Sequence, residues 1–377
     1  MSKILHFFVI LCLAVWLTGC GDSHKPVVQP QISSFAFMQD TGGYLFTPML
    51  GKYTTTGATT VFTVSPVLDS STNLPVTGEF YSIALSADGS KAVVDLYGGQ
   101  NGDSGQWDIF VADSGDRGNM VAITNDLYRD AMPQFSPDAT KVVFNSERPG
   151  PKGAQQWQIV TRRVDGSGEV VLPMPLGADQ TWAPTYSPDG SKIAVEAWGY
   201  DSLGNFFDGI VIMRADGSNP KLLTNPVAIC DCYDENPSFT ADGRKITFSG
   251  ESWDASTATE TEDIYIMNMD GTGLTQLTSG VGVNFDPMAV SIVGVGPRIL
   301  FSSNWGNPEL GGSGAYELYS MKLDGTELTR LTTNAAYDGF SSERYESQTA
   351  AAQASRRMNV PHHLHPLGQN RGHKMRW

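Results

Sequence analysis

The sequence predicts an all-β protein, a six-bladed β-propeller of four-stranded antiparallel blades. Three observations support this fold class. A turn phrase between two short apolar strands returns about every 50 residues, which is the mark of a repeat architecture. A second strand with alternating apolar and polar residues lies between successive copies. The 377 residues also include 40 Gly and 21 Pro, as expected of a β chain with many turns.

The first repeated element is the turn between strands A and B of each unit, clearest as Ser-Pro-Asp-Gly at residues 187–190. Each copy has a hydroxyl residue followed two positions later by Asp. The four copies are Ser86-Ala87-Asp88-Gly89, Ser136-Pro137-Asp138-Ala139, Ser187-Pro188-Asp189-Gly190 and Thr240-Ala241-Asp242-Gly243. A strand with a basic first residue follows each turn, and a fifth such strand begins at Arg298. We interpret the Asp residues of this phrase as structural, because Asp and Gly are typical turn formers.

The second repeated element supplies strands C and D. Alternating strands are predicted near residues 107–111, 157–160, 208–212, 262–266 and 316–320. An Asp-containing turn, usually Asp-Gly, follows each one, and a short strand then ends in most copies in Leu-Thr or Ile-Thr. Each unit therefore holds four strands joined by hairpins. One such sheet cannot bury both of its faces, whereas several sheets packed around an axis can.

The repeat sets the domain organisation. Residues 32–345 form the propeller, in which residues 79–333 hold five clear repeats and residues 32–78 a divergent first blade. The divergent blade lacks an obvious strand A. We expect residues 334–345, through Tyr337-Asp338-Gly339-Phe340, to supply that strand and close the ring. Residues 346–377 break the pattern and are interpreted as a disordered tail, in which residues 351–377 contain five basic residues and no acidic ones.

Two phrases carry a resemblance to a known family. Ser-Pro-Asp-Gly-Ser-Lys-Ile at 187–193 and Met-Asp-Gly-Thr-Gly-Leu-Thr-Gln-Leu-Thr at 269–278 resemble the TolB-type propeller repeat. The same repeat occurs in propellers attached to prolyl-oligopeptidase-like hydrolases. The resemblance covers about residues 79–345 and implies the fold more than a function. TolB itself has an α/β domain before its propeller, whereas here we expect only a tether, so the chain is TolB-like and not TolB. No Gly-x-Ser-x-Gly motif follows the last repeat.

The N-terminus predicts export. Residues 1–19 combine Lys3, an apolar run over 4–17 and a small-residue end, which describes a signal peptide. The run is too short to span a membrane. Its ending, Leu-Thr-Gly-Cys, resembles the bacterial lipoprotein signal, which implies acylation of Cys20 and a lipidated tether over 20–31. The alternative is an ordinary signal peptide with a chance Cys. Gly21, in place of Asp, favours the outer membrane in a Gram-negative cell.

Composition excludes several classes of function. All 40 acidic residues lie between positions 20 and 350, so the body should repel nucleic acid. No His lies between residues 25 and 361, which excludes a His-dependent nucleophile or zinc site there. No cofactor is predicted, and no residue pattern supports a divalent cation such as calcium. Whether Cys230 and Cys232 pair stays open.

The candidate binding surface is the face that carries the long B–C loops and the D–A loops, because function gathers where loops vary on a rigid scaffold. Aromatic residues lie in the B–C loops, and the D–A loops hold four Asp residues, each expected shortly before an inner strand. The candidate ligand-binding residues are Asp130, Asp234, Asp286, Asp338, Trp198, Tyr200, Trp253 and Trp305. Aromatic rings offer flat apolar area and carboxylates accept hydrogen bonds from cationic groups. The alternative is that these residues cap turns and pack between blades.

Two functions remain in competition. The first is a monomeric, non-enzymatic binding propeller, anchored in the cell envelope by lipid and directed at a protein, peptide or glycan. The second is a polysaccharide lyase or glycoside hydrolase that uses carboxylates or a divalent cation, since paired carboxylates can hydrolyse glycosides. The spacing of the four Asp residues discriminates between them. Two carboxylates about 5–10 Å apart in an open cleft would favour the enzyme, whereas carboxylates spread round a ring would favour the binder.

Overall fold

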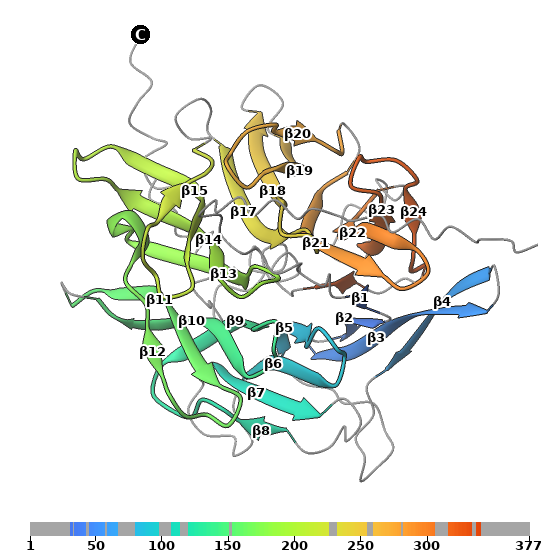
Figure 1. Cartoon of the computed structure of the whole chain (residues 1–377), viewed down its shortest axis with the longest axis horizontal. Coiled ribbons are helices and arrows are strands. Elements are labelled where there is room, and N and C mark those ends of the chain that lie inside the picture. Colours follow the sequence, from blue (N-terminus) through green and yellow to red (C-terminus); the bar gives the residue numbers. More distant parts are fainter. Residues whose placement is uncertain are drawn as a thin grey trace, which may run out of the picture.

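The computed structural model is a closed ring of six β-sheets around one axis (Figure 1). It describes residues 31–32, 34–42, 45–56, 59–66, 80–97, 107–113, 120–150, 153–225, 232–254, 259–279, 282–305, 316–333 and 337–340. All strands within a blade pair antiparallel, and the first strand of each blade lies nearest the axis. The predicted fold class, an all-β ring of six four-stranded blades, is confirmed.

The first three blades contain the following strands. Blade 1 contains β25 (Asp338–Gly339), β2 (Ser34–Gly42), β3 (Leu45–Thr56) and β4 (Thr59–Pro66). Blade 2 contains β5 (Phe80–Leu85), β6 (Lys91–Tyr97), β7 (Trp107–Asp113) and β8 (Val121–Ala122). Blade 3 contains β9 (Arg129–Phe135), β10 (Lys141–Pro149), β11 (Gln155–Arg163) and β12 (Val170–Val171).

The remaining three blades follow the same order. Blade 4 contains β13 (Gln180–Tyr186), β14 (Lys192–Tyr200), β15 (Phe206–Arg214) and β16 (Lys221–Leu222), with a short 3-10 turn, η1 (Pro175–Gly177), before it. Blade 5 contains β17 (Cys232–Phe239), β18 (Lys245–Asp254), β19 (Thr259–Asn268) and β20 (Thr275–Gln276). Blade 6 contains β21 (Asn284–Ile292), β22 (Gly296–Ser303), β23 (Glu317–Met321) and β24 (Thr329–Arg330).

The two ends of the propeller meet in blade 1. The inner strand β25 comes from the C-terminal end, and its residues Asp338 and Gly339 pair with Gln39 and Met38 of β2. A further short strand, β1 (Gln31–Ile32), pairs in parallel with the last two residues of β21 in blade 6. The chain therefore enters the ring beside blade 6 and closes it in blade 1.

The two faces of the ring differ in their connections. We call the face with the A–B and C–D turns, such as 187–190 and 216–217, the turn face, and the opposite one, with the B–C and D–A connections, the loop face. On the turn face the repeated phrase builds the same contacts in four blades. In blade 4, Ser187 Oγ donates to Asp189 Oδ1 at 2.6 Å and accepts from Lys192 N, while Asp189 accepts from Ser191 N. These bonds explain the phrase structurally.

The Thr of the repeated Leu-Thr or Ile-Thr phrase also has a structural role. Its hydroxyl accepts a hydrogen bond from a backbone N–H near the start of strand C in the same blade. The four pairs are Ile109 with Thr124, Ile210 with Thr224, Ile264 with Thr278 and Leu318 with Thr332. The short strand D is thereby fixed against strand C by a side chain as well as by the sheet.

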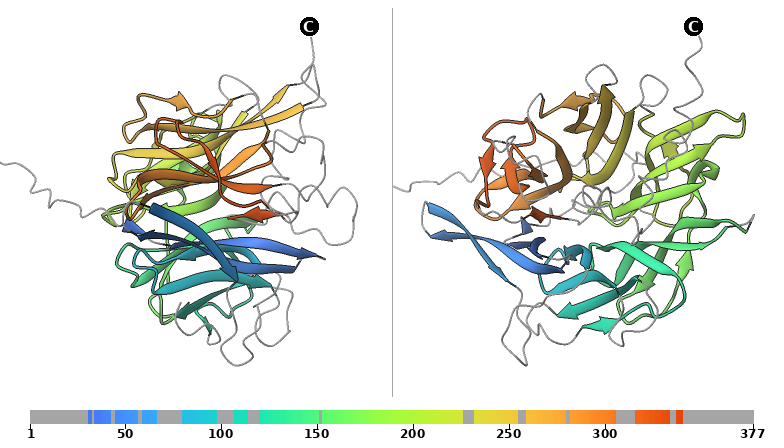
Figure 2. Two further views of the ribbon diagram at one scale, coloured as in Figure 1. Left: turned by 90° about the vertical axis from the view of Figure 1, so that its right-hand side faces the viewer. Right: turned by 180° about the vertical axis from the view of Figure 1, so that it is seen from behind.

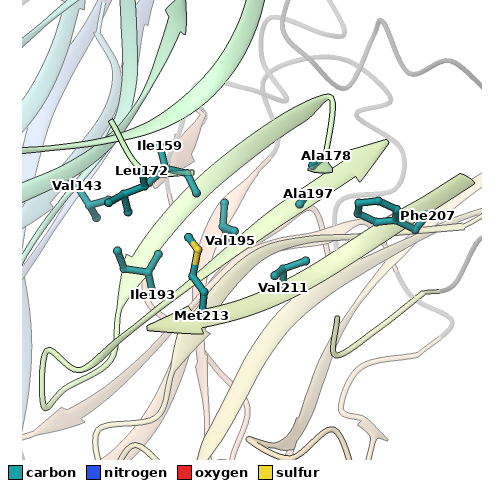
Figure 3. Close-up of a cluster of buried hydrophobic side chains, with 10 residues drawn as sticks. All are labelled: Val143, Ile159, Leu172, Ala178, Ile193, Val195, Ala197, Phe207, Val211 and Met213. Carbon is teal, nitrogen blue, oxygen red and sulfur yellow. The ribbon is translucent and has the colours of Figure 1, made fainter. Parts of the chain in front are cut away.

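Apolar side chains fill the space between neighbouring blades, as Figure 3 shows for blades 3 and 4. Val143 and Ile159 of blade 3 meet Ile193, Val195 and Val211 of blade 4, and all five are fully buried. Similar clusters lie between the other blades. The side view shows the sheets stacked around the axis with their strands running between the two faces (Figure 2). This packing makes the ring a rigid frame for its channel.

Candidate functional site

The main described cavity is the turn-face half of the central channel. It has a volume of about 260 Å³ and is lined by the inner strands of blades 2 to 6 and, in blade 1, by Phe35 and Ala36 of β2 and by Phe340. Half-exposed residues of the A–B turns, including Pro137, Pro188 and Ala241, form its rim. The cavity therefore reaches the surface on the turn face. The sequence interpretation had given this face no binding role.

A repeated backbone feature shapes the deep end of the cavity. In four blades the inner strand has a residue with positive φ directly before a proline, and the pairing register shifts at that point. These residues are Met132, Ala183, Asn236 and Asp286, with φ values of 55, 48, 51 and 52°. Such a left-handed residue forms a bulge, at which the inner strand departs from its regular pairing with strand B.

Two of the bulge residues form a polar pair in the cavity. Asn236 Nδ2 donates to Asp286 Oδ1 at 2.9 Å, joining blade 5 to blade 6. Both residues line the cavity and are more than nine-tenths buried. Asn236 Oδ1 has no hydrogen-bond partner among the described residues. A buried amide oxygen of this kind needs a donor, so the pair can accept an N–H or O–H group from a ligand.

Aromatic rings from blades 2, 3 and 4 pack together on the loop-face side of the bulges. Tyr81 of blade 2 and Trp182 of blade 4 contact each other edge to face, with ring centroids 5.9 Å apart, although blade 3 lies between their blades. Trp157 of blade 3 packs on Trp182 at 4.9 Å. Ala131, the residue of blade 3 at this level, is small and leaves room for the contact. These rings therefore occupy the side of the channel next to blades 2 to 4.

The four predicted Asp residues do not form one ring. Asp130, Asp234 and Asp338 occupy equivalent places in blades 3, 5 and 1, as shown by their partners Ser146, Gly250 and Gln39 on strand B. All three are buried, and Asp338 accepts a hydrogen bond from Gln39 Nε2. Asp286 lies two residues further along its strand and is the one of the four that lines the cavity.

Burial changes the protonation of two of these residues, Asp130 and Asp234. Desolvation raises the pKa of Asp130 to about 8, with a further increase from Asp126, against the hydroxyl of Ser146 and the charge of Arg148. Desolvation likewise raises the pKa of Asp234 to about 7. At neutral pH these two carboxyls are therefore partly or mostly protonated. They contribute less negative charge than their number suggests.

The candidate aromatic residues have different environments. Trp198 is buried in the same cluster as Tyr81 and Trp182. Trp305 is half-buried and stacks on Tyr319, whose hydroxyl donates to Trp305 O at 2.6 Å. Tyr200 is 48% exposed on the loop face and contacts Phe206. The side chain of Trp253 lies outside the described residues, as do residues 1–30, with Cys20, and the tail after 340.

Sequence reasoning missed three of the four bulge residues, Met132, Ala183 and Asn236, and it missed Asp95. Asp95 is fully buried and accepts hydrogen bonds from the backbone N–H groups of Ser82 and of Met132 in the next blade. Burial raises its pKa to about 6. A signal for the bulges was present, since a proline three residues before the turn phrase recurs at 133, 184 and 237. An acid in the middle of a β-branched strand, as at Asp95, was a further signal.

The described part of the chain lacks two kinds of feature, a cluster of metal ligands and a membrane-spanning helix. No group of three or more His, Cys, Asp or Glu residues is arranged there to hold a metal ion. No helix in that part is long and apolar enough to cross a membrane.

Comparison with known proteins identifies the fold. No family model matches the chain. An uncharacterized protein of Agrobacterium fabrum is 32% identical over 120 residues, a match that covers 31% of this chain and 38% of that protein. The match therefore spans less than half of the length of this curated relative.

Two solved structures match about four fifths of the chain. TolB from Acinetobacter baumannii superposes with a TM-score of 0.57 at 18% identity, over 81% of this chain and 65% of that one. A protein assigned as TolB from Agrobacterium tumefaciens gives 0.50 at 15% identity, over 81% and 92% of the two chains. The protein has a TolB-like propeller fold. At these identities the likeness concerns the fold alone.

Proposed function

We propose that this protein is a non-enzymatic binding propeller of the bacterial cell envelope, held to a membrane by lipid on Cys20. Its ligand is a protein segment, peptide or glycan that donates hydrogen bonds. The proposed contact residue in the cavity is Asp286, and Tyr200 and Trp305 are candidates for a separate contact on the loop face. The observation that carries the proposal is the cavity itself, which all six blades build and in which Asn236 and Asp286 offer acceptors.

The chemistry of the cavity supports a ligand with an apolar body and a polar end. Prolines and apolar side chains, among them Phe239 and Met288, form much of its wall. Asp286 Oδ1 already accepts one bond from Asn236, so the pair is held in place before a ligand arrives. A preorganised acceptor pair in an apolar surround favours N–H or O–H donors over anions.

The spacing of the carboxylates supports binding over catalysis. Asp130, Asp234 and Asp338 lie on alternate blades and are buried, so the three do not share an open cleft. A pair of carboxylates that flank a glycosidic bond must both reach the substrate. The lyase or hydrolase alternative therefore gains no support from these residues.

The lipid anchor has a direct test. Cys20→Ala should move the protein from the membrane fraction to the soluble fraction, because the acyl chains supply about 0.8 kcal/mol per buried methylene. Mass spectrometry of the wild-type N-terminus should show an acylated Cys20. Membrane association that persists in Cys20→Ala would sink the lipoprotein assignment.

The binding proposal is tested by capture from envelope extract with the immobilised protein. Asp286→Asn keeps the shape of the side chain and removes its charge, and the matched control is Asp324→Asn in an exposed turn of the same blade. We expect wild type and Asp324→Asn to retain the same molecules and Asp286→Asn to lose them several-fold. An identical set of captured molecules for all three proteins would argue that the cavity is not the binding site.

A further inference from the structure

We infer that the cavity recognises an arginine side chain of a peptide, whose guanidinium group donates hydrogen bonds to both Asp286 and Asn236. This inference rests on the proposed binding role of the cavity and names the chemical group that enters it. Four observations carry it: the charge of the lining, the acceptor left open on Asn236, the fixed backbone beneath the two residues and the apolar walls.

The lining of the cavity contains one charged residue. Among the described residues that form the wall, Asp286 is the one with a charged side chain, and none is basic. Asp286 is 7% exposed, so its ionised carboxyl faces walls that are mostly apolar. A hydrogen bond from a cationic donor to a carboxylate is roughly twice as strong as one between neutral groups. The cavity therefore selects a cationic donor over a neutral one.

Two acceptors stand next to each other at the deep end of the cavity. Asn236 Nδ2 donates to Asp286 Oδ1 at 2.9 Å, so the amide oxygen is the group that Asn236 offers to a ligand. This oxygen is buried and has no hydrogen-bond partner among the described residues. The carboxyl of Asp286 can accept further donors beside Asn236, since its two oxygens together offer about four acceptor sites. A group with several N–H donors can therefore bond to both side chains at once.

The polar pair is an addition to the fold rather than a requirement of it. The same positive-φ position before a proline holds Met132 in blade 3 and Ala183 in blade 4, so the bulge forms without a polar side chain. In blades 5 and 6 the next residues are Pro237 and Pro287, whose rings restrict the backbone. The backbone beneath both acceptors is thus fixed before a ligand arrives, which lowers the entropy that binding costs.

The walls favour a guanidinium group over an ammonium group. Phe135, Tyr186 and Phe239 line the cavity with aromatic rings, and prolines form part of its rim. A guanidinium group is flat, weakly hydrated and able to stack on aromatic rings, whereas an ammonium group is a compact, strongly hydrated charge. The guanidinium group therefore loses less hydration free energy in this surround. Its planar array of donors also suits two acceptors that stand on neighbouring blades.

The depth of the cavity favours a long side chain on a peptide that enters the mouth. The bulges lie four residues before the A–B turns at the rim, which is roughly 13 Å along a strand. Arginine has the longest of the cationic side chains, so it reaches furthest below the main chain that carries it. The protein has 40 acidic and 25 basic residues, and its field attracts basic segments.

The test uses four mixtures of immobilised heptapeptides with random neutral flanks. The central residue is arginine, lysine, leucine or citrulline, which is the neutral isostere of arginine. Retention of the full-length protein on each mixture is measured for wild type, for Asp286→Asn and for the exposed-turn control Asp324→Asn. Circular dichroism confirms that the three proteins are equally folded.

We expect the arginine mixture to retain wild type and Asp324→Asn about ten-fold more than the citrulline mixture, because a hydrogen bond between charged groups contributes more. The lysine mixture should fall between these two. In Asp286→Asn the ratio of arginine to citrulline should drop below about three-fold. Equal retention by arginine and citrulline in wild type, or retention by lysine equal to that by arginine, would overturn the inference without any variant. An unchanged ratio in folded Asp286→Asn, or no retention by the arginine mixture, would overturn it as well.

The same proteins separate this inference from the proposed function. If capture from envelope extract depends on Asp286 but the peptides show no preference for arginine, the cavity binds a different donor and the inference alone fails. If capture from the extract does not depend on Asp286, the proposed function fails. The arginine-to-citrulline ratio then still reports whether the cavity has the chemistry inferred for it.

Discussion

The two halves of the central channel use the same inner strands for opposite purposes. Toward the loop face, the large rings of Tyr81, Trp157 and Trp182 pack together across blades 2 to 4, and Asp130 is buried within β9. Toward the turn face, small residues and prolines leave a cavity whose deep end holds Asn236 and Asp286. A difference of one or two positions along the strand thus separates packing from a solvent-accessible site. The position of an acid relative to the bulge decides which role it takes.

The largest expected effect is a loss of stability when a packed ring on the loop-face side of the channel is removed. Trp182→Ala removes a side chain that is 2% exposed and contacts rings from two other blades, and should cost about 3–5 kcal/mol of unfolding free energy. Met288→Ala, at a half-buried residue in the wall of the cavity, should cost less than half as much. Urea denaturation measures both. Equal losses would show that the two halves do not differ in packing.

The second effect is a dependence of stability on pH. Burial raises the pKa of Asp130 from 3.8 to about 8 and the pKa of Asp234 from 3.8 to about 7, so the folded state binds extra protons between these values. Stability should therefore fall, by the order of several kcal/mol in total, as pH rises from about 4 to about 8. Thermal unfolding across this range is the measurement.

Two comparisons sharpen the pH prediction. Asp130→Asn should remove much of the slope between pH 5 and 8. The turn-face Asp88 has the opposite shift, since the hydroxyl of Ser86 and the backbone of Ser90 lower its pKa to about 2. Its contribution is complete above about pH 4 and is lost only toward pH 2. A slope that is unchanged in Asp130→Asn would contradict the assignment.

The smallest effect concerns the turns. Gly190 and Ala139 hold equivalent places in two A–B turns, with φ values of 70 and 54°. A side chain in this left-handed region costs about 1 kcal/mol, so Gly190→Ala should destabilise and Ala139→Gly should stabilise by about that amount. Paired denaturation curves test this. Changes of the same sign at both positions would mean that contacts outside the turn dominate.

The fold could be predicted from the sequence because the same local sequence signals recur in most blades. The phrase at 187–190 sets the A–B turn, and the Thr at 224 or 278 fixes strand D, so local chemistry repeated along the chain specifies the ring. The candidate site was harder to predict. Asp130 and Asp286 look alike in sequence, yet the register shift at the bulge places only the second in the cavity. Burial of Trp198 depends on contacts between blades, which no single repeat reveals.

The central claim is that ligand binding belongs to the turn-face half of the channel, and two isosteric substitutions test it most directly. Capture from envelope extract is measured for Asp286→Asn and for Asp130→Asn, with equal folding confirmed by circular dichroism. The account predicts that Asp286→Asn loses the captured ligand several-fold and that Asp130→Asn retains it. Loss in Asp130→Asn with full capture by Asp286→Asn would contradict the account and move the binding site to the loop-face half.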